Sequence, residues 1–139
     1  MWTSVIIDDE HKSRETLKKI IERYFNNQIS VVYLAESVKD GVFAINKYNP
    51  KLVFLDIEMP EENGFKLFEY FDYYEFDVIF TTAYKQYAID AIKCSALDYL
   101  LKPINYIDLK EVIKRLEEKE RKLTPQTQIE AFLTNINSN

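Results

Sequence analysis

Five short apolar runs, separated by stretches in which apolar residues recur at helical spacing, constrain the fold of this chain more than any other feature. Each run is nearly continuous rather than alternating, which is typical of parallel strands buried on both faces of a sheet. The runs cover residues 5–7, 31–34, 52–55, 78–80 and 99–101. The helical stripes are Leu17, Ile20, Ile21 and Tyr24, then Val38, Val42 and Ile45, then Tyr84, Tyr87, Ala88, Ala91 and Ile92, and finally Leu109, Val112, Ile113 and Leu116. This alternation predicts a doubly wound α/β fold with a five-stranded parallel sheet and helices on both of its faces.

Two polar pairs mark expected helix starts. Ser37 precedes Asp40, and Asn105 precedes Asp108, with the spacing of a capping box in which Asp replaces the preferred Glu or Gln. The pairs predict that one helix begins after Ser37 and another after Asn105.

Length and composition fit one domain. The 139 residues are 47% hydrophobic, which is ample for a single packed core. We expect this domain to occupy residues 1–120. Beyond it, Thr124 and Pro125 interrupt a charged helical stretch, and a polar tail follows. Residues 121–139 are therefore predicted to be a linker or C-terminal tail.

Charge and cysteine content exclude several classes of protein. A net charge of −5 argues against a nucleic-acid surface within this segment, because phosphate binding requires clustered Lys and Arg. The lone Cys94 cannot form an internal disulfide, and residues 1–9 lack the pattern of a signal peptide. No apolar run approaches the roughly 20 residues that span a bilayer. We therefore expect a cytoplasmic protein with no membrane contact of its own.

Reactive side chains collect where the predicted strands end. Asp8 and Asp9 follow the first strand, Asp56 ends the third, Thr82 ends the fourth, and Lys102 follows the fifth. In an open parallel sheet the ligand crevice lies beyond these carboxyl ends. Three carboxylates brought together there require either a hard divalent cation or raised pKa values. Mg²⁺ is the better choice, since it commonly links one or two carboxylates to a phosphate.

This set of residues suits phosphoryl transfer to the protein itself. A carboxylate such as Asp56 can attack phosphorus to form an acyl phosphate. Lys102 would supply a fixed positive charge, and the Thr82 hydroxyl could donate a hydrogen bond to an attached phosphoryl oxygen. The only histidine, His11, lies beyond the acidic pair, at the start of the first helix. With no base among the strand-end residues, we expect no sustained enzymatic turnover.

Four motifs in order resemble the receiver domains of two-component response regulators, over residues 2 to 120. They are Ile6-Ile7-Asp8-Asp9-Glu10, Leu55-Asp56-Ile57-Glu58-Met59-Pro60 with Gly64, Thr81-Thr82-Ala83, and Tyr99-Leu100-Leu101-Lys102-Pro103. The resemblance implies a flavodoxin-like (βα)5 fold with strand order 2-1-3-4-5. It also implies phosphorylation of Asp56 and a Mg²⁺ ion held by Asp8, Asp9, Asp56 and the backbone carbonyl of Glu58.

Further roles follow from the same resemblance. Lys102 would contact the phosphoryl group. The peptide bond between Lys102 and Pro103 is expected to be cis. Thr82 matches the switch hydroxyl of the family and Tyr99 the switch aromatic. Glu58 and Tyr84 occupy the positions that modulate the lifetime of the aspartyl phosphate. A packing role for Tyr99 alone remains an alternative, because the chain holds ten tyrosines.

Residues 80–84, 87–89 and 96–104 look like the receivers of LytTR-type transcription regulators. That likeness implies a sensor histidine kinase as phosphodonor and homodimerisation after phosphorylation. It implies contact with DNA only through an output domain that this chain does not contain.

Three other functions share parts of this pattern. A receiver-shaped interaction module would work without phosphate, although all the acidic, hydroxyl and lysine positions are retained here. A haloacid-dehalogenase-like phosphatase would carry its nucleophile after the first strand of its core and a second Asp two residues later, whereas Glu58 follows Asp56. A flavin carrier would need a phosphate-cradling loop where Asp9, Glu10 and His11 stand.

Overall fold

The computed structural model describes residues 1–84 and 98–122 of the chain. Its strands are β1 (Trp2–Ile7), β2 (Ile29–Ala35), β3 (Leu52–Asp56), β4 (Asp77–Thr82) and β5 (Asp98–Leu101). Its helices are α1 (His11–Tyr24), α2 (Val38–Tyr48), the 3₁₀ helix η1 (Gly64–Tyr70) and α4 (Tyr106–Lys122). The helix expected around Tyr87 to Ile92 and the tail after residue 122 lie outside the described residues.

All five strands form one parallel sheet in the order β2-β1-β3-β4-β5, which confirms the predicted fold class and strand order. The chain moves outward from β1 to β2 and then returns to place β3 on the other side of β1. The winding direction therefore reverses between β1 and β3, and this is the point where α/β sheets open a crevice at the carboxyl ends of their strands.

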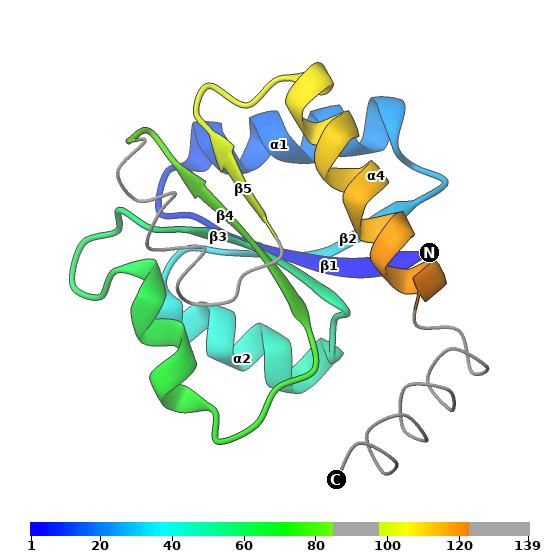
Figure 1. Cartoon of the computed structure of the whole chain (residues 1–139). Helices are drawn as coiled ribbons and strands as arrows, with labels where there is room; N and C mark the ends of the chain where they lie inside the picture. The colour runs from blue at the N-terminus through cyan, green and yellow to red at the C-terminus, as the bar shows by residue number, and fades with distance from the viewer. Residues whose placement is uncertain (85–97, 123–139) are drawn as a thin grey trace, which may run out of the picture.

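Helices cover both faces of the sheet, as Figure 1 shows, with α1 and α4 on one side and α2 and η1 on the other. Leu17 and Ile21 of α1 share a buried cluster with Leu109 and Val112 of α4. The opposite cluster includes Ala44 of α2 and joins it to η1. Because β3 is buried along its whole length, its continuous apolar pattern reflects contact with both helical layers.

Both predicted helix starts are present. The Ser37 hydroxyl accepts a hydrogen bond from the backbone N–H of Asp40, 3.1 Å away, at the start of α2. The side-chain oxygen of Asn105 accepts one from the N–H of Asp108 at 2.9 Å, beside α4. Each bond satisfies one of the N–H groups that the first turn of a helix leaves unpaired.

The connection between β3 and β4 is a 3₁₀ helix rather than an α-helix. In a 3₁₀ helix, residues i and i+3 lie directly above one another. Phe65 and Phe68 have this spacing, and both rings contact Phe80 of β4, with centroid distances of 4.9 and 6.1 Å. The tighter helix therefore places two aromatic rings on the same buried strand residue.

Helix α4 is the last helix within residues 1–84 and 98–122. Helix α4 continues through Arg121 to Lys122, so it passes position 120, where the predicted domain ends. Within residues 1–84 and 98–122, no helix combines the length and apolar character needed to cross a membrane.

Candidate functional site

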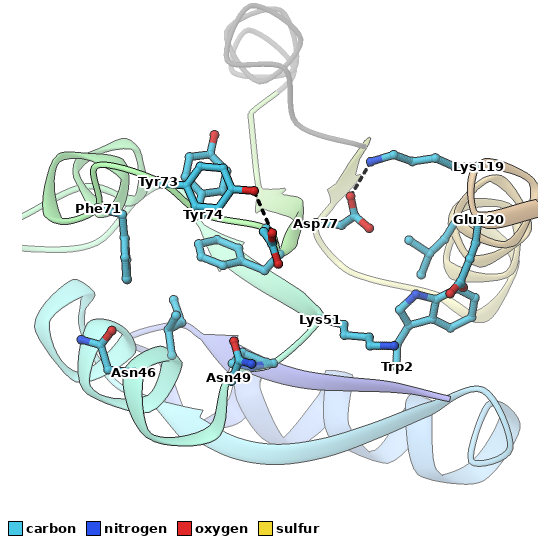
Figure 2. Close-up of a pocket in the computed structure, with 15 residues that line it drawn as sticks. Trp2, Asn46, Asn49, Lys51, Phe71, Tyr73, Tyr74, Asp77, Lys119 and Glu120 are labelled. Atoms are coloured by element: carbon cyan, nitrogen blue, oxygen red, sulfur yellow. Dashed lines mark hydrogen bonds and ion pairs between the residues drawn. The ribbon is translucent and has the colours of Figure 1, made fainter. Parts of the chain in front are cut away.

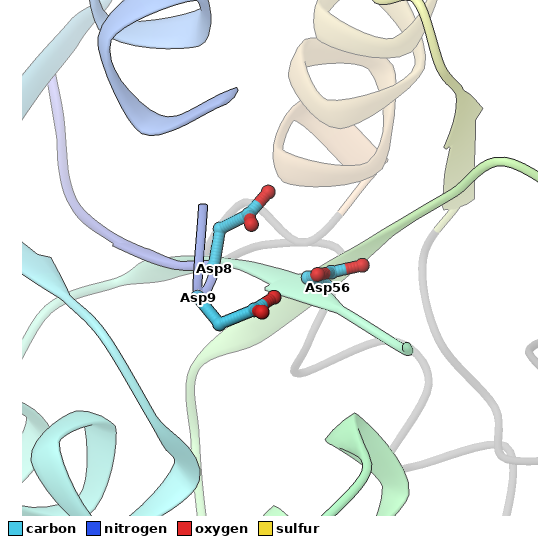
Figure 3. Close-up of side chains that lie close together, drawn as sticks. All are labelled: Asp8, Asp9 and Asp56. Atoms are coloured by element: carbon cyan, nitrogen blue, oxygen red, sulfur yellow. The ribbon is translucent and has the colours of Figure 1, made fainter. Parts of the chain in front are cut away.

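Three carboxylates meet at the carboxyl ends of β1 and β3, as Figure 3 shows. Asp8 and Asp9 directly follow β1, and Asp56 is the last residue of β3. One oxygen from each of the three lies within 4.8 Å of the other two. Asp8 is 4% exposed and Asp56 is 1% exposed, so two of these charges lie away from bulk water. The structure thus brings together the acids that the sequence predicted at the strand ends.

Lys102 brings a positive charge to this cluster. Its Nζ atom lies 2.9 Å from Asp8 Oδ2 and 3.4 Å from Asp56 Oδ1. Burial alone would lower the pKa of Lys102, but the hydrogen bond to Asp8 and the charges of both aspartates together raise that pKa. Lys102 therefore stays protonated. The backbone N–H of Lys102 donates to the backbone carbonyl of Thr82 at 2.7 Å, and the peptide bond from Lys102 to Pro103 is cis.

Asp56 is electrostatically the most perturbed residue of the site. Burial and the nearby charge of Asp8 raise its pKa to about 8, with a further contribution from Glu58, although Lys102 opposes the shift. One lysine therefore does not neutralise the acids gathered around Asp56. A bound cation would restore the balance and favour the ionised carboxylate.

Two buried oxygens support a metal ion at this position. Asp9 Oδ1 accepts no hydrogen bond within the described part of the chain, and Asp56 Oδ1 has only the Lys102 ammonium nearby, at 3.4 Å. Buried carboxylate oxygens without donors are costly unless a cation or water satisfies them. Mg²⁺ binds oxygen ligands and carboxylates in such sites, so Asp8, Asp9 and Asp56 fit this ion. The predicted role of the Glu58 carbonyl stays a prediction.

Thr82 and Glu58 are joined by their side chains. The Thr82 hydroxyl donates a hydrogen bond to Glu58 Oε1 at 2.8 Å, and the Ala83 N–H donates to the same oxygen at 3.0 Å. Thr82 is fully buried, and its neighbour Thr81 is opposite Asp56 in the β3–β4 register. The hydroxyl predicted to meet a phosphoryl oxygen thus belongs to the residue that follows the register partner of Asp56, and it binds the Glu58 carboxylate.

Tyr99 and Tyr84 lie near the same strand ends. Tyr99 is half-buried in β5, opposite Phe80 in the β4–β5 register, and packs against the cluster that contains Phe80. Tyr84 is 52% exposed, and its backbone N–H donates to the Thr82 hydroxyl oxygen at 3.0 Å. The switch role of Tyr99 and the lifetime role of Tyr84 stay predictions.

Sequence reasoning missed the contribution of Arg14. This arginine of α1 is 7% exposed, and its Nη1 donates to the backbone carbonyl of Asp8 at 2.8 Å. It thereby fixes the chain at the point where Asp8 enters the site. The sequence does show an arginine in the first helix. The apolar stripe of that helix does not include position 14, however, so the pattern gave no reason to expect that this side chain is buried.

A hollow lies at the other end of the sheet from the acidic site, as Figure 2 shows. It is lined by Trp2, Lys51 and Asp77, which stand at the amino ends of β1, β3 and β4, and by part of the aromatic stretch after η1. Lys119 of α4 pairs with Asp77 at its edge. Because Asp56 ends β3 whereas Lys51 precedes it, this hollow is separate from the acidic site.

Family comparisons agree with this geometry. A model of the response regulator receiver domain matches residues 5–114. A response regulatory protein of Vibrio cholerae is 37% identical, with 92% of this chain and 54% of the relative covered. The sensory transduction protein LytT of Bacillus anthracis is 32% identical, with 94% and 51% covered. The transcriptional regulatory protein BtsR of Escherichia coli is 33% identical, with 89% and 53% covered. The chain spans about half the length of these relatives.

Solved structures give the same result. The REC domain of AraT, a response regulator from Geobacillus stearothermophilus, is similar with a TM-score of 0.75 and 31% identity, covering 88% of this chain and 98% of that one. The LytT and BtsR relatives agree with the predicted likeness to LytTR-type regulators. With its 2-1-3-4-5 sheet and its family match, this chain belongs to the response regulator receiver domains of two-component signalling.

Proposed function

We propose that this chain accepts a phosphoryl group on Asp56, with Mg²⁺ held beside it by Asp8 and Asp9, and changes its surface in response. One observation carries the proposal: Asp56 is buried between two other carboxylates and within 3.4 Å of the Lys102 ammonium. This arrangement supplies an oxygen nucleophile, cation ligands and a fixed positive charge at one strand end.

The proposed reaction transfers a phosphoryl group from a phosphohistidine of a sensor kinase. An Asp56 carboxylate oxygen forms the new O–P bond while the P–N bond to the donor imidazole breaks, and the imidazole takes up a proton. Bound Mg²⁺ would neutralise charge on the transferring oxygens. Lys102 stabilises the same charge, and Asp8 orients Lys102 through the 2.9 Å contact.

The product is a modified receiver rather than a released compound, so we propose a switch without enzymatic turnover. In this proposal the chain works in the cytoplasm, and its phosphorylated form dimerises and controls a DNA-binding output domain. Support comes from relatives of about twice its length, which include a transcriptional regulatory protein.

Intact mass after incubation with acetyl phosphate tests the proposal. We expect wild-type protein to gain one phosphoryl group in the presence of Mg²⁺ and none when Mg²⁺ is chelated. Asp56→Asn should gain none. The control is Asp72→Asn, which removes an exposed carboxylate that lies outside the cluster and should be modified like wild type.

Failure of wild-type protein to gain mass, with folding and Mg²⁺ binding intact, would contradict the proposal. It would favour the alternative of an interaction module that works without phosphate. Modification of Asp56→Asn to the wild-type extent would place the acceptor elsewhere.

A further inference from the structure

The Glu58 side chain occupies two hydrogen-bond donors at the end of β4. Glu58 Oε1 accepts from the Thr82 hydroxyl at 2.8 Å and from the Ala83 N–H at 3.0 Å. The Tyr84 N–H donates to the Thr82 hydroxyl oxygen at 3.0 Å, which helps to orient the hydroxyl. A threonine hydroxyl has a single proton, so the Thr82 hydroxyl cannot serve Glu58 and another acceptor at once.

These two donors belong to the two residues that follow the register partner of the proposed phosphoacceptor. Thr81 is opposite Asp56 in the parallel register of β3 and β4, so Thr82 and Ala83 continue just past the end of β3. A phosphoryl group on Asp56 would bring anionic oxygens that require donors of this kind. The Glu58 carboxylate is also an anion, and it already holds both donors in the unmodified chain.

The other interactions of the Glu58 carboxylate favour its displacement from Thr82 and Ala83. Its second oxygen, Oε2, is buried and accepts no hydrogen bond from any residue in the described ranges. A buried carboxylate oxygen without a donor is unfavourable. The charge of Glu58 also acts on Asp56, so added negative charge at Asp56 would repel it.

The geometry points to Glu58 as an intramolecular competitor of the phosphoryl group. In the unmodified receiver its carboxylate holds the Thr82 hydroxyl and the Ala83 amide, and phosphorylation of Asp56 must displace it before Thr82 can bind the phosphoryl oxygen. Glu58 thereby raises the free energy required for switching. This inference rests on the proposed function, because it needs a phosphoryl group at Asp56.

Beryllium fluoride, a phosphoryl analogue that binds carboxylates without a covalent transfer, provides the test. Its dissociation constant would be measured by calorimetry at saturating Mg²⁺ for wild type, Glu58→Ala and Glu58→Gln. We expect Glu58→Ala to bind about tenfold more tightly, because two charge-assisted hydrogen bonds no longer compete. Glu58→Gln should fall between the two, since its amide oxygen still reaches both donors. Glu61→Gln, an exposed acid of the same loop, should match wild type.

A double-mutant cycle separates competition for the hydroxyl from a general effect of charge. In a Thr82→Val background, Glu58→Ala should improve the affinity much less than it does in wild type. Equal gains in both backgrounds, or equal affinities for Glu58→Ala and wild type, would overturn the inference. An NMR readout without analogue adds a structural check: the Ala83 amide proton should shift upfield in Glu58→Ala but not in Glu61→Gln.

The mass experiment with acetyl phosphate keeps the two ideas distinguishable. If wild-type Asp56 is phosphorylated but Glu58→Ala gains no affinity for the analogue, the inference fails and the proposed function stands. If wild type neither gains a phosphoryl group nor binds the analogue, the proposed function fails and the inference fails with it.

Discussion

Among individual residues, Asp56 has the clearest consequence for pH dependence. Its pKa in the folded chain is about 8, against an ordinary value of 3.8, so the folded state holds a proton that the unfolded state releases between these values. The free energy of unfolding therefore falls as pH rises through this window. The contribution of the Asp56 proton to the stability of the folded state is complete below about pH 4 and is lost above about pH 8.

We predict that Asp56→Asn becomes progressively more stable than wild type as pH rises from about 5 to 9 without Mg²⁺, because Asn carries no charge to bury. The difference should change by a few kcal/mol, on the order of 3, and urea unfolding at several pH values measures it. Saturating Mg²⁺ should reduce the difference, since the cation favours ionised Asp56. A constant difference across the range would contradict this prediction.

For the individual site residues, the sequence predicted their positions at the strand ends but not every contact that their side chains make. The position of Asp8, Asp9, Asp56 and Lys102 follows from the strand ends, because parallel strands bring their carboxyl ends to one edge. The direction of a side chain in a loop has no such periodic constraint. For this reason the sequence did not predict that Glu58 binds Thr82.

Among the elements, η1 and the loop before it position Asp56. The N–H of Gly64 donates to the Ile57 carbonyl at 2.9 Å, which folds the loop back against β3. A Cβ atom at position 64 would lie 2.3 Å from the Asp56 carbonyl oxygen and 3.2 Å from the Ile57 Cα atom. Both are backbone atoms, so no rotation of a side chain can relieve the overlap.

We predict that Gly64→Ala lowers the free energy of unfolding by about 1–3 kcal/mol and weakens Mg²⁺ binding. The overlap would push the loop from β3 and move Asp56 away from Asp8 and Asp9. Urea unfolding measures the first effect, and a Mg²⁺ titration followed by calorimetry measures the second.

Gly41→Ala is the matched control. A Cβ at position 41 would lie 2.4 Å from Ile7 Cδ1, the flexible end of a side chain, and alanine favours the helical conformation of α2. This variant should lose less stability and bind Mg²⁺ as wild type does. Equal Mg²⁺ affinities for Gly64→Ala and wild type would show that the loop does not position Asp56.

The strands were predictable as elements because two helical layers bury them, which leaves a continuous apolar pattern. The 3₁₀ character of η1 was not, since Phe65 and Phe68 could occupy one face of either helix type. In the structure both rings contact Phe80, a residue distant in sequence. The local sequence pattern therefore predicts a buried aromatic face but not the type of helix that carries it.

For the molecule as a whole, α4 completes the second helical layer. Its Leu109, Val112, Ile113 and Leu116 are all at most 2% exposed and join the core that α1 covers. Beyond Leu116 the contacts become ion pairs and surface positions, such as Lys119 with Asp77. The buried core therefore needs α4 up to Leu116 but gains little apolar burial from residues 117–121.

We predict that a chain of residues 1–122 unfolds at the same urea concentration as the 139-residue chain, with the same m-value and Mg²⁺ affinity. A chain that ends at Lys114 loses buried Leu116 and the pairing of Arg115 with Asp98, so its free energy of unfolding should fall by about 2–4 kcal/mol. Equal stability of the 1–114 and 1–122 chains would show that the end of α4 does not hold the core. A large loss of stability in the 1–122 chain relative to the 139-residue chain would instead place residues 123–139 inside the folding unit, and a lower m-value would agree, since less surface would then become exposed on unfolding.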